Sequence, residues 1–188
     1  MPMTWLLLIV RLTGESSRTR VGVWRELRKI GAAPVSSGTW TVPDTPYFAT
    51  AVQKVVEIAG RGSGDVLVLP TSGGEDPSGQ ALCAAFRAQR LDEWQEFSRD
   101  CSKFEEEIAK EIRNSKFTLA ELEEEEQSLE RLRRWYRDLK SRDVLELPEA
   151  QAAEALLRQC AGVFDNYAER VYSTLHAPSQ TALQRNGD

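Results

Sequence analysis

Cysteine and histidine, the residues that most often carry metal or nucleophilic chemistry, are scarce in this sequence. The three cysteines, Cys83, Cys101 and Cys160, stand far apart and form no C-x-x-C pair, so neither a zinc site nor a disulfide framework is indicated. The single histidine, His176, stands close to the end of the chain, where a solvated side chain is expected. Because no Cys/His pair, Ser/His/Asp set or isolated carboxylate pair is present, we expect no metal, no cofactor and no enzymatic activity.

Long apolar runs are missing as well. The longest, Trp5 to Val10, is far shorter than the roughly 20 residues that cross a bilayer. No basic residue precedes it and no small-residue cleavage site follows it, which favours a buried strand over a signal peptide. We therefore expect a cytoplasmic protein with no membrane association. The glycine-rich stretch 72–79 lacks the G-x-x-x-x-G-K-[ST] pattern of a phosphate-binding P-loop.

Charge is plentiful but unevenly placed along the 188 residues. Residues 1–74 carry eight Lys or Arg and five Asp or Glu, a balance of +3, whereas the remainder carries sixteen and twenty-four, a balance of −8. A basic N-terminal part and an acidic C-terminal part indicate two functions or two partners, although charges that only solvate the surface would also explain this distribution.

The first 71 residues predict a strand, a helix, a β-hairpin, a second helix and a last strand. The strands are Trp5–Val10, 34–36, 39–43 and Asp65–Pro70, and the helices run from Arg18 to Ile30 and onward from Pro46. Ser17 and Gly31 are the expected caps of the first helix. This order predicts an α+β fold, a ferredoxin-like βαββαβ domain with both helices on one face of an antiparallel sheet.

The first helix has a basic side. On a helical wheel Val23, Trp24, Leu27 and Ile30 form the expected buried stripe. The remaining surface projects Arg18, Arg25, Arg28 and Lys29. Arg20 falls within the apolar sector, so we expect it to snorkel or to pair with Asp44 or a strand-end carbonyl.

The second part of the chain is predicted to be helical throughout. A polar linker at 72–79 separates domain 1–71 from domain 80–177, and the tail 178–188 is expected to be disordered. Apolar residues at helical spacing place two helices at 94–113 and 119–140, and a third after Pro148. Thr118 and Glu121 form a capping box between the first two. The prediction is a three-helix antiparallel, coiled-coil-like domain.

The order and spacing of these motifs resemble a known family. Trp5-Leu6-Leu7-Leu8, then Arg18-x-Arg20-x-x-x-Trp24-Arg25-x-Leu27-x-x-x-Gly31, then Gly38-x-x-x-Val42-Pro43 are similar to the N-terminal region of ChrB, and Lys140-Ser141-Arg142-Asp143 resembles that family's basic-Asp segment. ChrB is the regulatory protein of bacterial chromate-resistance operons. The resemblance implies chromate-responsive transcriptional control, with DNA contacts carried over to Arg18, Arg20, Arg25, Arg28 and Lys29.

The resemblance also implies partners. Full-length ChrB proteins have a second half of comparable size, whereas this chain ends at Asp188, so either a separate chain supplies that half or this protein has another role. A second copy of this chain is the other protein partner considered.

Three other possible functions are compared with DNA binding. An interaction or scaffold module would use the acidic hairpin and would not bind DNA. A metal-dependent nuclease of the CRISPR adaptation type needs an Asp at the end of its first strand, but Arg11-Leu12-Thr13 stands there. An oxyanion site at Ser16, Ser17 and Arg18 would use a helix start and a guanidinium to bind chromate or sulfate.

Overall fold

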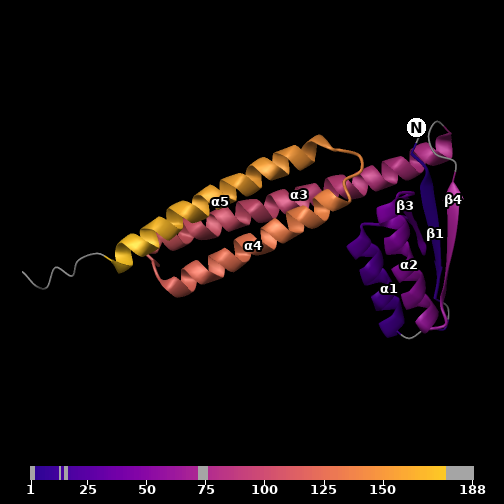
Figure 1. The fold of residues 1–188 in the computed structure, drawn as a ribbon, viewed down its shortest axis with the longest axis horizontal. Coiled ribbons are helices and arrows are strands. Elements are labelled where there is room, and N and C mark those ends of the chain that lie inside the picture. Colours follow the sequence, from indigo (N-terminus) through magenta and orange to yellow (C-terminus); the bar gives the residue numbers. More distant parts are fainter. Residues whose placement is uncertain (1–2, 13, 15–16, 72–75, 177–188) are drawn as a thin grey trace, which may run out of the picture. The chain divides into compact units, whose positions relative to one another are not determined.

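The computed structural model describes residues 3–12, 14, 17–71 and 76–176 and contains four strands and five helices in those ranges. Figure 1 shows the ribbon. The strands are β1 Trp5–Arg11, β2 Ala33–Ser36, β3 Thr39–Pro43 and β4 Asp65–Thr71. The helices are α1 Ser17–Ile30, α2 Pro46–Arg61, α3 Pro77–Arg113, α4 Leu119–Ser141 and α5 Pro148–Leu175. The fold is therefore α+β, as the sequence predicted. No described helix is both long and apolar enough to span a membrane.

The four strands form one antiparallel sheet in the order β2-β3-β1-β4. Leu8 of β1, for example, lies between Trp40 of β3 and Val68 of β4. Helices α1 and α2 cover one face of this sheet (Figure 1). They run antiparallel, because Arg18 and Arg61 line one depression between them whereas Lys29 and Tyr47 line another.

A single apolar core lies between the helices and the sheet. It contains alternate residues of the strands and one stripe of each helix, namely Leu6, Leu8, Val42, Val66, Val23, Leu27, Ile30, Phe48, Val52, Val55 and Ala59. Period-two burial in the strands and period-3.6 burial in the helices place these side chains together. The expected stripe of α1 was correct for Val23, Leu27 and Ile30 but wrong for Trp24, which is 52% exposed. The buried stripe is narrow, and Trp24 lies about 100° around the helix from Val23.

The division into two compact units differs from the predicted boundary at 72–79. One unit contains residues 1–93 and 142–146, and the other contains 94–141 and 147–188. The first part of α3 belongs to the sheet-containing unit because Phe86 packs on Trp5 and Phe48, with ring centroids 5.5 and 5.8 Å apart. The end of the predicted linker, Pro77 to Gly79, already belongs to α3. Residues 72–75 and the tail 178–188, which was expected to be disordered, lie outside the described residues.

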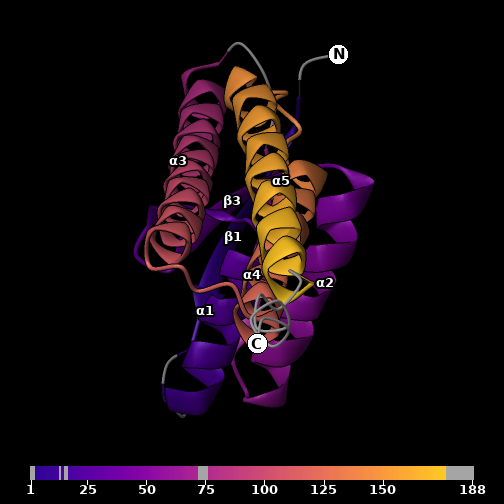
Figure 2. The ribbon, with the colours of Figure 1, turned by 90° about the vertical axis from the view of Figure 1, so that its left-hand side faces the viewer.

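The second unit consists of the rest of α3 with α4 and α5 (Figure 2). Helix α4 runs antiparallel to α3, since Phe97 contacts Trp135 near one end and Lys116 pairs with Glu121 at the other. The backbone N–H of Glu121 donates to Thr118 Oγ1 at 3.3 Å, which confirms one half of the predicted capping box. Cys101 and Cys160 are fully buried free thiols.

Candidate nucleic-acid interface

The outer surface of α1 carries basic side chains without exposed acidic ones. Arg18, Arg20, Arg25, Arg28 and Lys29 are all exposed. The one acidic residue of the helix, Glu26, is turned toward α2, where its carboxylate pairs with Lys54 at 3.2 Å. The helix also has no acidic residue in its first turn. A phosphate approaching this surface therefore meets positive charge and the positive end of the helix dipole.

Arg20 does not have the structural role expected of it. Its side chain is exposed, and its Nη2 donates to Ser17 Oγ at 3.4 Å. Within the described residues no ion pair joins it to Asp44. The buried stripe of α1 starts only at Val23. Arg20 lies about one turn before Val23 and is therefore beyond the edge of the core, although it has the same angular position on the helix as the buried residues.

An exposed indole stands among these cations. The Arg28 guanidinium lies over the ring of Trp24, with its Cζ 5.1 Å from the ring centroid. A cation over an indole face is attracted by the ring quadrupole, and the stack holds both groups in the same orientation. Aromatic faces and guanidinium planes are the groups on which nucleic-acid bases stack. The wheel assigned Trp24 to the core, so its role at this surface was missed.

The end of α1 that carries Arg28 and Lys29 is anchored by buried charge. Arg142 donates from Nη1 to the main-chain oxygen of Lys29 at 2.7 Å, and its Nε lies 3.6 Å from the Glu93 carboxylate. Arg90, which is 1% exposed, donates to the same carboxylate at 2.9 Å. Burial lowers the pKa of Arg90 to about 10, although the charge of Glu93 opposes this. The hydrogen bond from Arg142 satisfies the carbonyl of Lys29, which lies in the last turn of α1 and has no partner within the helix.

Gly31 is the residue that lets these arginines approach. Its φ of +79° is left-handed, and a Cβ built on it would lie 2.5 Å from Arg90 Nη1 and 2.6 Å from Arg142 Cδ. A residue with a side chain would be strained in this conformation and would displace the guanidinium groups. The predicted glycine C-cap is confirmed, and its reason includes the packing of two arginines as well as the backbone turn.

A depression of about 620 Å³ lies between the start of α1 and the end of α2. Ser17, Arg18 and Arg25 line it from α1, and Arg61, the last residue of α2, lines it together with the following Gly62. Two residues of the expected oxyanion site, Ser17 and Arg18, are therefore brought together with two further arginines, while Ser16 lies outside the described residues. Arg61 was missed because it stands 43 residues after Arg18 in the sequence, outside the basic helix, and meets Arg18 only through the packing of α2 beside α1.

Comparison with known proteins shows which family the sequence resembles. Residues 20–178 match the family described as "Protein ChrB, N-terminal". Protein ChrB of Cupriavidus metallidurans is 29% identical over 91 residues, a stretch that covers 48% of this chain and 28% of that relative. No solved structure matches the chain. Because the family match extends over most of the sequence, the chain belongs to the ChrB N-terminal family.

Proposed function

We propose that this chain is a non-catalytic regulatory module that binds DNA through the outer surface of α1 and acts in the cytoplasm in chromate resistance. The observation that carries the DNA-binding part is the Trp24–Arg28 stack, flanked by the exposed Arg25 and Lys29. Cations on one helix face supply attraction to phosphate, and a held aromatic face supplies a surface for a sugar or base. The chromate-resistance part rests on membership of the ChrB N-terminal family.

The fold supports a finer classification, which we also propose. The order βαββαβ, with β1 and β3 central and β2 and β4 at the edges, is what a ferredoxin-like domain requires. The three long helices of the second unit would then form a coiled-coil-like antiparallel domain. In such a domain both helices cover one face of the sheet, and the basic residues of α1 lie on its exposed side.

Fluorescence anisotropy with a labelled 30-base-pair duplex tests the DNA-binding proposal. We expect binding at 50 mM salt that weakens steeply as the salt concentration rises, because phosphate contacts release counterions. Replacing Arg25, Arg28 and Lys29 with alanine is expected to abolish it. The matched control replaces three exposed arginines of the second unit, Arg99, Arg134 and Arg137, with alanine. Equal loss in both triple variants, or no binding by the natural chain at low salt, would reject the proposal.

A second candidate function is an interaction module that works with a separate chain. Strands β1 and β4 pair Leu7 with Leu69 and Ile9 with Leu67. Since Val66 points into the core, Leu67 and Leu69 project from the other face of the sheet, and they are 41% and 38% exposed. An apolar patch on a free sheet face is typical of a protein contact.

Sedimentation velocity tests this second candidate with the second half of the Cupriavidus protein produced as a separate chain. We expect a complex that is lost when Leu67 and Leu69 are both replaced with lysine. If the two chains sediment independently, or if the double variant still binds, this sheet face is not the contact. A faster-sedimenting species in the absence of the second chain would identify a homodimer instead.

A further inference from the structure

A charged groove lies between α3 and α4 in the second unit, whereas every residue discussed for nucleic-acid binding belongs to the first unit. Its volume is about 340 Å³. The groove is lined by Asp100, Lys103, Phe104 and Glu107 of α3 and by Glu124, Glu125, Ser128, Arg131 and Leu132 of α4. Four of these nine side chains are acidic and two are basic, so the groove has an excess of negative charge.

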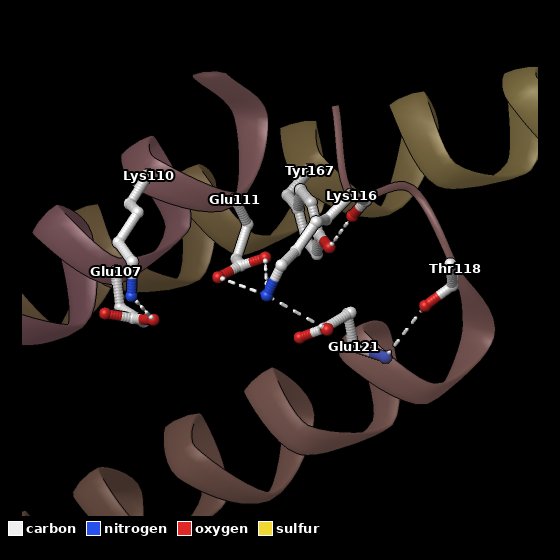
Figure 3. A network of polar contacts seen from close by, with 7 residues as sticks. All are labelled: Glu107, Lys110, Glu111, Lys116, Thr118, Glu121 and Tyr167. Atoms are coloured by element: carbon white, nitrogen blue, oxygen red, sulfur yellow. Dashed lines mark hydrogen bonds and ion pairs between the residues drawn. The ribbon is translucent and has the colours of Figure 1, made fainter. Parts of the chain in front are cut away.

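The lysines around the groove are already bound to other carboxylates. Lys110 pairs with Glu107 at 2.7 Å, and Lys103 pairs with Asp100 at 2.8 Å. At the turn between the helices, Lys116 lies between Glu111 and Glu121, at 3.1 and 3.3 Å (Figure 3).

The turn itself is held in place from α5. The Tyr167 hydroxyl donates to the main-chain oxygen of Lys116 at 2.6 Å (Figure 3). The ammonium group of Lys116 is occupied by Glu111 and Glu121, and Lys116 is not among the residues that line the groove.

Glu125 is the carboxylate without a counter-charge. It is 5% exposed, and within the described residues only burial and the charges of neighbouring groups act on its carboxylate, with no hydrogen bond to it. The other cation of the groove, Arg131, forms no ion pair with it. The charges that face it are mostly of the same sign: Glu107 and Glu111 from α3, and Glu121 and Glu124 from its own helix.

Two causes raise the pKa of Glu125 to about 7. The first is burial, and the second is the charge of these neighbouring carboxylates. Tyr167 is the titratable neighbour on α5, and its own pKa is raised by burial and by the glutamates. At neutral pH the groove therefore needs a positive charge, either as a proton on Glu125 or as a cation from outside the chain.

The lining indicates which kind of cation fits. A metal ion is disfavoured, because the described residues hold no group of three Asp, Glu, His or Cys side chains arranged as ligands. Phe104 and Leu132 line the groove beside the carboxylates. This combination suits a cationic head on an apolar stem, which packs its methylene groups while the charge meets a carboxylate.

We propose that this groove receives an arginine or lysine side chain of a partner protein, with Glu125 as its counter-charge. The Glu125 carboxylate supplies specificity for the cation, and the exposed Glu124, which also lines the groove, strengthens the attraction. The site is independent of the proposed DNA contacts, since none of its residues belongs to α1.

The test uses the full chain labelled with carbon-13 and follows the carboxyl signal of Glu125 by NMR. The probe is the peptide acetyl-Gly-Ala-Arg-Ala-Gly-amide, and the control peptide contains uncharged citrulline in place of arginine. We expect saturable binding of the arginine peptide at pH 7 and low salt, with a dissociation constant on the order of 1 mM. If the arginine peptide binds the ionised form of Glu125 ten times more tightly than the protonated form, linkage requires the midpoint of the Glu125 titration to fall by about one pH unit at saturating peptide.

Two variants separate this site from general electrostatic attraction. Glu125→Gln removes the charge without changing the shape of the side chain and should abolish saturable binding. Glu123→Gln, at an exposed position of the same helix that does not line the groove, should preserve it. Circular dichroism of both variants checks that the helices are intact.

The proposal is overturned if the citrulline peptide binds as well as the arginine peptide, or if Glu125→Gln binds like the natural chain. An unchanged Glu125 midpoint at saturating arginine peptide also overturns it, because a proton alone would then meet the need for charge. Concentration-dependent dimerisation that shifts the Glu125 signal without any peptide would identify a second copy as the occupant and would likewise overturn it.

Discussion

Arg142 donates a hydrogen bond of 2.7 Å from Nη1 to the main-chain oxygen of Lys29, a residue 113 positions earlier in the chain. The guanidinium therefore caps the helix whose outer surface carries the candidate DNA contacts. It is also 3.6 Å from Glu93. The segment between α4 and α5 is in this way part of the sheet-containing unit, although its flanking helices belong to the other.

We expect Arg142→Ala to lower the free energy of unfolding by about 3 kcal/mol, because it leaves the buried Glu93 with one partner fewer and uncaps α1. Urea denaturation followed by circular dichroism measures this change. The control, Arg134→Ala at an exposed position, should alter stability by less than about 0.5 kcal/mol. Equal stability of the two variants would contradict the anchoring role of Arg142.

Gly31→Ala should destabilise the protein by about 1–3 kcal/mol, since the residue has a left-handed backbone and no room for a Cβ. Gly60→Ala makes a matched comparison within α2, where a Cβ would meet nothing within 4 Å. There alanine should stabilise the helix by about 0.5–1 kcal/mol. Thermal denaturation of the two variants should therefore shift the midpoint in opposite directions. A shift in the same direction would show that the approach of the arginines to Gly31 is not tight.

The raised pKa of Glu125 predicts how the stability of the second unit depends on pH. Its pKa in the folded protein is raised to about 7 from an ordinary value of 4.5. The folded state then holds more protons than the unfolded state between these values, so stability decreases as the pH rises from 4.5 to 7. Because part of this effect is screened by solvent, the decrease is expected to be less than about 3 kcal/mol.

Urea denaturation at pH 5 and pH 8 measures this dependence. The variant Glu125→Gln should lose the contribution of Glu125 and should be more stable than the natural chain at pH 8. If the difference between the two proteins is the same at both pH values, Glu125 does not titrate in this window.

Tyr167→Phe removes the hydrogen bond of 2.6 Å to the Lys116 carbonyl. We expect a loss of about 1 kcal/mol, the usual net contribution of such a bond. The comparison variant is Tyr172→Phe, whose side chain is 53% exposed and whose change should be close to neutral. Differential scanning calorimetry distinguishes the two, and an equal effect would argue that the Tyr167 hydroxyl does not hold the turn.

Trp24→Ala separates a role in binding from a role in the core. An indole that is 52% exposed should contribute little to folding, so the unfolding midpoint should stay within experimental error of the natural chain. Binding of the labelled duplex should weaken roughly tenfold, as expected for the loss of one stacking platform. A large loss of stability would show instead that Trp24 belongs to the core, as its sequence position had suggested.

Local patterns predicted the elements because their signals come from near neighbours along the chain. Alternation and apolar runs located the four strands, and caps such as Gly31 and Thr118 placed helix ends. The same reasoning failed at the domain boundary. A polar, glycine-rich composition at 72–79 predicted a division there, but the apolar side chain of Phe86 draws the start of α3 onto the sheet.

The sequence by itself determined the α+β class, the element order and the concentration of arginine on α1. Only the tertiary structure decided that Trp24 faces outward, that Arg61 joins Arg18 and Arg25 in one depression, and that Arg142 caps α1. The physical reason is the range of the interactions involved. Helix and strand periodicity is set within a few residues, whereas burial and ion pairing depend on which distant segments pack together.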